Sequence, residues 1–71
     1  MTKQTINRIE KMKSYVIDDL VNIYHYPKNN AEKMVEHSAF GEMIKVEPKY
    51  VFHYSVEYWA KDIIEEYSLA V

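Results

Sequence analysis

The sequence contains no cysteine, a single glycine and only two prolines among its 71 residues. Without cysteine, the chain has no disulfides, no thiolate chemistry and no cysteine-type zinc site. One glycine is too few for a glycine-rich loop that would cradle a phosphate. Together with 48% apolar residues, this composition is typical of a folded helical domain rather than of a disordered tail.

Long apolar runs are also missing. No run approaches the roughly 20 residues that span a bilayer, and the start "MTKQTINRIEK" lacks the apolar core of a signal peptide. We therefore expect a cytoplasmic protein with no membrane contact. A single domain over residues 1–71 buries only about 60% of its unfolded surface, so dense packing or a second chain must supply the stability that disulfides cannot.

The charge is nearly balanced overall but uneven along the chain. The net charge of −2 argues against a nucleic-acid partner, because nucleic-acid-binding proteins usually carry a basic surplus. Residues 1–13 nevertheless hold four cations and one carboxylate, whereas residues 57–71 hold one cation and four carboxylates. The chain therefore has a basic start and an acidic end.

Apolar residues recur at steps of three and four through the first third of the chain, as in a helix that is buried along one side. They are Ile6, Ile9, Met12, Val16, Leu20 and Ile23. The pattern predicts a helix over about 4–25, with Thr2 or Thr5 as its N-cap. The helix must end near His25, because Pro27 lacks an N–H group and pushes the preceding residue out of the α region.

A second helix is predicted over about 29–40. Asn29 can cap its start, and Gly41 is suited to the position that follows the last turn. The next stretch, 42–54, is left open between a turn of helix that starts at Pro48 and a short strand. We favour the helix, because a lone strand cannot satisfy its backbone hydrogen bonds.

The third helix has the most regular pattern. Ser55 is a natural N-cap, and Tyr54 before it can pack on Trp59 as a hydrophobic staple. The apolar spacing beyond this cap predicts a helix over about 55–68. The predicted fold is an all-α bundle of three helices, or of four segments if 42–54 is helical. Its predicted core consists of Ile9, Val16, Leu20, Met34, Val35, Phe52, Trp59, Ile63 and Ile64.

No catalytic or metal-binding motif stands out. The three histidines are neither in an H-E-x-x-H arrangement nor beside one another at helical spacing. No serine lies in a nucleophile motif, and the adjacent carboxylates at 18–19 and 65–66 diverge on a helix surface. We therefore expect a protein that is not an enzyme and that has no metal or cofactor.

Exposed tyrosines and charged residues are the candidates for a protein interface. Tyr15 and Tyr58 point away from the apolar stripes of their own helices, and exposed tyrosine is a common anchor of interfaces. The charged candidates are Arg8, Lys11, Lys13, Asp62, Glu65 and Glu66. The expected function is a small protein-binding module that regulates or inhibits a larger protein, or that self-associates. The alternative is a nucleic-acid-binding regulator that uses the basic N-terminal helix.

Whether the two charged ends pair between chains or within one chain depends on the relative direction of the first and third helices. Cations near the N-terminus of a helix oppose its macrodipole, so an acidic partner should compensate them. If the first and third helices are parallel, the charged ends lie apart and can pair only between chains, which favours a homodimer. If the helices are antiparallel, the charges meet within one chain.

The segment "HYSVEYWAKDIIEEY", and the chain from about residue 15 to 67, resembles the short helical proteins that are common in Gram-positive bacteria and in their phages and mobile elements. Proteins of that kind tend to be accessory regulators, antitoxins or inhibitors that act by binding another protein. The resemblance implies an all-α fold and a function of this type, and it carries no site residues.

Overall fold

Five α-helices make up the regular structure of residues 2–69, the part of the chain that the computed structural model describes. They are α1 (Lys3–Asn22), α2 (Lys28–His37), α3 (Ala39–Val46), α4 (Pro48–Phe52) and α5 (Val56–Leu69). The prediction of an all-α fold is confirmed. The prediction of three helices, or of four segments, is wrong, because the second predicted helix breaks at Ser38 into α2 and α3 and the next stretch adds α4.

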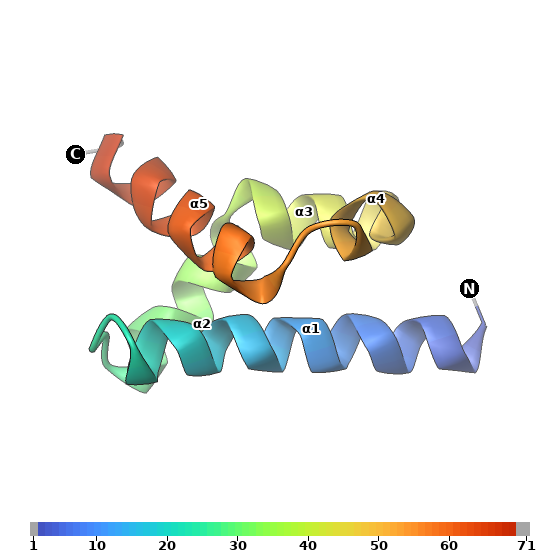
Figure 1. Ribbon diagram of the computed structural model, residues 1–71, viewed down its shortest axis with the longest axis horizontal. Coiled ribbons are helices and arrows are strands. Elements are labelled where there is room, and N and C mark those ends of the chain that lie inside the picture. Colours follow the sequence, from blue (N-terminus) through green and yellow to red (C-terminus); the bar gives the residue numbers. More distant parts are fainter. Residues whose placement is uncertain (1, 70–71) are drawn as a thin grey trace.

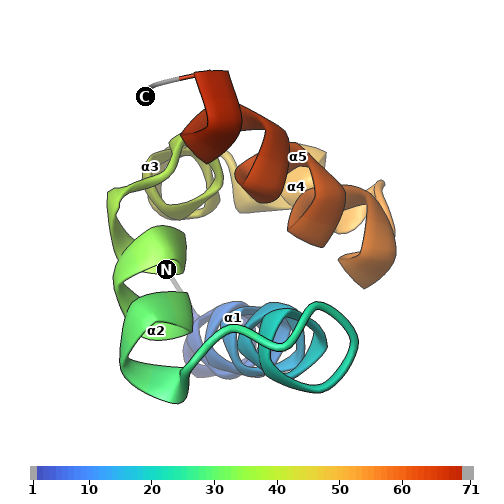
Figure 2. The same ribbon diagram turned by 90° about the vertical axis from the view of Figure 1, so that its left-hand side faces the viewer.

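The helices lie on two levels that α2 connects. α1 runs along one side of the molecule, and α3, α4 and α5 lie across from it (Figure 1). Figure 2 shows α2 at one side, where it leads from the end of α1 to the start of α3. α1 packs most extensively on α5 and then on α2. Both α1 and α5 run leftward in Figure 1, so the two helices point in the same general direction.

Local contacts set both ends of α1. The Thr2 hydroxyl accepts a hydrogen bond of 3.2 Å from the N–H three residues on, which confirms Thr2 as the N-cap. The helix stops before its predicted end at His25, because His25 has a φ of 64° in the left-handed region. This conformation turns the chain so that the Tyr26 N–H donates to the Leu20 carbonyl at 3.0 Å, which closes the last turn.

Ser38 and Gly41 produce the break between α2 and α3. The Ser38 hydroxyl donates to the Val35 carbonyl at 2.8 Å and accepts from the Gly41 N–H at 3.1 Å, so it closes one helix and caps the next. Gly41 lies in the first turn of α3, where a Cβ atom would overlap the Val35 carbonyl oxygen. The prediction that Gly41 follows a helix end is therefore wrong. Asn29 is also not a cap, because α2 already begins after Pro27 and has no side-chain cap.

The stretch between the second and third predicted helices is helical, as we favoured. Pro48 stands in the first turn of α4, where its missing N–H is not needed. Ser55 caps α5 by accepting a hydrogen bond of 3.1 Å from the Tyr58 N–H. Tyr54 packs edge-on against Trp59, with ring centroids 5.7 Å apart. The predicted cap and the predicted staple are both confirmed.

The core lies between α1 and the helices opposite. Seven of the nine predicted core residues are buried, whereas Phe52 and Ile64 are half-buried at its edge. Phe40, Ile44 and Val51 are also fully buried, and we did not predict them. They belong to α3 and α4, whose buried faces cannot be assigned before the helix break is known. No helix within residues 2–69 combines the length and the apolarity needed to cross a bilayer.

Candidate binding surfaces

Three tyrosines form a row on the outside of α4 and α5, which we call the tyrosine ladder: Tyr50, Tyr54 and Tyr58. The rings of Tyr50 and Tyr54 meet edge-on with centroids 5.4 Å apart, and those of Tyr54 and Tyr58 stack at 4.5 Å. Each residue keeps 38–45% of its surface exposed. Tyr54 raises the pKa of the Tyr50 phenol, mainly through a side-chain hydrogen bond. The ladder thus exposes a continuous row of three aromatic rings to solvent.

Trp59 supports the ladder from the core side. Its ring lies edge-on to Tyr54 and Tyr58 and packs on Phe40 with centroids 5.3 Å apart. Its Nε1–H donates to the Val51 carbonyl at 2.9 Å, which ties α5 to α4. Trp59 itself is only 3% exposed. Because the ladder rests on a buried base, its rings lose little conformational freedom on binding.

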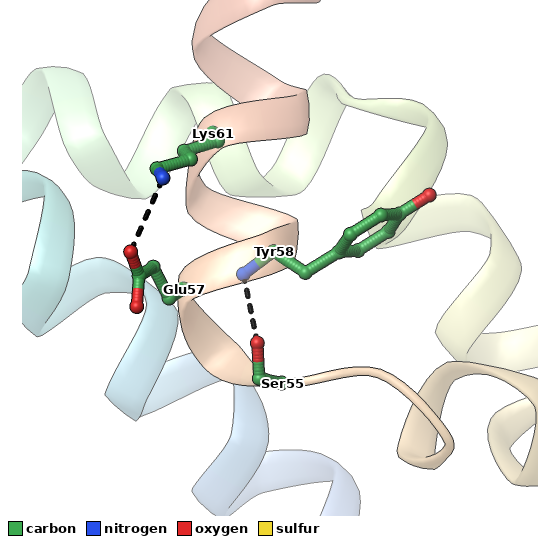
Figure 3. A network of polar contacts seen from close by, with 4 residues as sticks. All are labelled: Ser55, Glu57, Tyr58 and Lys61. Atoms are coloured by element: carbon green, nitrogen blue, oxygen red, sulfur yellow. Dashed lines mark hydrogen bonds and ion pairs between the residues drawn. The ribbon is translucent and has the colours of Figure 1, made fainter.

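The start of α5 separates an aromatic side from a charged side (Figure 3). The Tyr58 N–H donates to the Ser55 hydroxyl, and Lys61 Nζ lies 3.2 Å from Glu57 Oε1. Figure 3 shows the Tyr58 ring on the opposite side of α5 from this ion pair. The Glu57–Lys61 ion pair therefore lies away from the Tyr58 ring.

The two tyrosines that we predicted to be exposed are exposed, in different settings. Tyr15 is 53% exposed on α1 and contacts no other aromatic ring within residues 2–69. Tyr58 is 45% exposed and belongs to the ladder. The prediction assigned Tyr54 to the staple alone and left out Tyr50. Tyr50 lies in α4 and Tyr54 lies between α4 and α5, so the wheel of a single helix does not place them beside Tyr58.

Four basic side chains from α1 and α4 surround a second surface, which we call the basic cradle: Arg8, Lys11, Lys49 and His53. The central carbon of the Arg8 guanidinium lies 4.2 Å from the centre of the Phe52 ring. Two pockets, of about 380 and 310 Å³, share Arg8 as a lining residue. All four basic side chains are exposed. The structure thus joins two of the predicted basic candidates to two residues that we did not predict.

The third predicted basic candidate, Lys13, lies apart from the cradle. It is half-buried and lines a groove between α1 and α2. The carboxylates of Glu10, Asp18 and Glu32 line the same groove. Lys13 therefore lies among acidic residues and does not add to the charge of the cradle.

The predicted acidic candidates do not meet the basic cradle. α1 and α5 run in the same direction (Figure 1), and Arg8 and Lys11 lie in the first half of α1, whereas Asp62 lies midway along α5 and Glu65 and Glu66 lie in its second half. Glu66 Oε1 accepts a hydrogen bond of 3.1 Å from the Ala39 N–H, which satisfies a free donor at the start of α3. Burial raises the pKa of the Asp62 carboxyl, and the charges of Glu66 and Glu65 raise it further. Two of the three acidic candidates are thus involved in contacts within the chain.

An apolar pocket of about 470 Å³ lies between α2 and α5. It is lined by Tyr26, Asn30, Lys33, Met34, Tyr67 and Ser68. The Tyr67 hydroxyl donates to the Lys33 carbonyl at 3.4 Å and links the two helices. Lys33 is the one charged residue among those that line the pocket.

Neither a metal site nor a similar known protein indicates a function for the described residues. The described residues contain no group of three histidine, aspartate or glutamate side chains placed to hold a metal ion. No family model, curated protein or solved structure matches the chain. The resemblance to short helical proteins of Gram-positive bacteria and their phages therefore stays a prediction that rests on the sequence.

Proposed function

We propose that this chain is a cytoplasmic protein-binding module that uses the tyrosine ladder to bind an apolar segment of another protein. The observation that supports this function is the ladder itself, a row of three exposed rings in which Tyr54 contacts both neighbours and two rings pack on a buried tryptophan. Tyrosine is enriched among the residues that dominate interface energies, because its large ring has few rotatable bonds. Binding would then regulate or inhibit the larger protein that carries the segment.

The size of the ladder favours a short segment over a second copy of the chain. A buried tyrosine removes about 150–250 Å² from water, so three rings that are 38–45% exposed offer roughly 190–320 Å². A standard interface needs about 800 Å² from each partner. The ladder is therefore large enough for a few side chains of a segment and too small to form the face of a standard homodimer by itself.

A phage-displayed peptide library tests this function directly. We expect the protein to select apolar segments, and Tyr50→Ser to weaken their binding at least about ten-fold, a loss of about 1.4 kcal/mol. Tyr50 suits the test because its ring contacts only Tyr54 within the ladder, so the core is left intact. Tyr15→Ser, which removes an exposed tyrosine outside the ladder, is the matched control. Segments that bind Tyr50→Ser as tightly as the parent would contradict the proposal.

A second candidate function is that of a nucleic-acid-binding regulator. The observation that favours it is the basic cradle, in which α1 and α4 bring four basic side chains to one surface. The net charge of −2 opposes it. Retention on heparin that disappears at modest salt would support this candidate over the protein-binding module.

A further inference from the structure

The basic cradle gathers positive charge around two pockets that no carboxylate lines. One of its pockets is lined by Arg8, Lys49, Phe52 and His53, and the other by Arg8, Lys11 and two amide side chains. No acidic residue lines either pocket. The one ion pair found within residues 2–69 lies on α5, so it does not neutralise any cradle residue.

This arrangement is unfavourable for the isolated chain. Arg8 and Lys11 lie three residues apart in α1, so their like charges are neighbours on the helix surface. Lys49 on α4 adds a like charge beside Arg8 in the same pocket. The second half of α5, which holds Glu65 and Glu66, lies toward the opposite end of the molecule (Figure 1). A bound anion would remove this repulsion.

Arg8 is already held in a geometry that suits an anion. The central carbon of its guanidinium lies over the half-buried Phe52 ring, 4.2 Å from the ring centre, which restricts the position of the group. The guanidinium carries its N–H donors along its edge. This edge matches the paired oxygens of a phosphate or a carboxylate.

We propose that the basic cradle binds the phosphate group of a small phosphate monoester. Three permanent cations and an imidazole exceed what one carboxylate needs, and they suit a phosphate monoester, which carries a charge of about −1.5 to −2 at pH 7. The pockets of about 380 and 310 Å³ lie at the lower end of the range for small-ligand sites. This inference goes beyond the proposed function, because the cradle and the ladder use different side chains.

An NMR titration of the full chain with inorganic phosphate tests the site. We expect saturable shifts confined to the backbone amides around Arg8, Lys11 and residues 49–53, and no such shifts from sodium chloride at the same ionic strength. Lys49→Ala changes an exposed residue and leaves the Arg8 contact with Phe52 in place, so it should weaken binding roughly ten-fold without unfolding the chain.

A control variant and two further ligands complete the test. Lys33→Ala removes a cation from α2, outside the cradle, and should bind phosphate like the parent. Arg8→Lys keeps the charge but loses the planar donor edge, so it should bind phosphate more weakly. O-phosphoserine should compete with inorganic phosphate at the same amides. Shifts that sodium chloride reproduces, an unchanged affinity of Lys49→Ala, or binding of a DNA oligonucleotide without binding of either phosphate ligand would overturn the proposal.

Discussion

Gly41→Ala is a substitution for which local propensity and tertiary structure predict opposite signs. In a helix, alanine is more stable than glycine by about 0.5–1 kcal/mol, because glycine loses more conformational freedom on folding. Gly41 lies within α3 and does not have a positive φ, so its backbone conformation is open to any residue. Helix propensity alone therefore predicts that the variant is more stable than the parent.

The structure predicts the reverse, because the first turn of α3 lies against the end of α2. A Cβ atom on Gly41 would overlap the Val35 carbonyl oxygen and lie 2.9 Å from that of Glu36. Both are backbone atoms, so no side-chain rotation relieves the overlap and the two helices must separate. Overpacking costs about 1–3 kcal/mol, and backbone overlap belongs at the upper end of that range. After the gain in propensity is subtracted, the net loss of stability is roughly 1–2 kcal/mol.

Thermal unfolding followed by circular dichroism measures this effect. A domain of this size loses about 4–8 °C in Tm per kcal/mol, so Gly41→Ala should melt about 5–15 °C below the parent. Ser14→Ala, at an exposed position in α1, is the control and should be neutral or slightly stabilising. A Gly41→Ala variant that melts at or above the parent would refute the close approach of α2 and α3.

Two further predictions concern the core and the oligomeric state. Trp59→Ala should cost about 3–5 kcal/mol and abolish the folded far-UV spectrum at room temperature, because it empties a buried site and removes the hydrogen bond from Nε1–H to the Val51 carbonyl. Melting within a few degrees of the parent would place Trp59 outside the core. The basic cradle and the acidic end lie apart, so they can pair only between two chains, and we predict a weak self-association that salt reduces. Glu65 should be its main acidic contact, because Asp62 is half-buried and Glu66 accepts a hydrogen bond within the chain. Light scattering at ~100 μM in low and high salt measures it, and a strict monomer at both salt concentrations would contradict the prediction.

The candidate surfaces were predictable only where they depend on one helix. The wheel of α5 was enough to place Tyr58 on the outside, because the direction of a side chain on a regular helix follows from its spacing. Tyr50 and Tyr54 could not be placed in this way, because their exposure depends on how α4 is docked against α5. Arg8 was a candidate for its charge alone, and its contact with Phe52 joins residues that are distant in the sequence.

The sequence by itself determined the all-α class, the apolar stripes of α1 and α5, and the caps at Thr2 and Ser55. Each of these depends on residues within one or two helical turns, so composition and spacing contain the necessary information. Only the tertiary structure decided that Gly41 lies inside a helix, and that Glu66 bonds a backbone N–H 27 positions away. These features depend on which segments lie beside each other, and the period of a helix does not specify its neighbours.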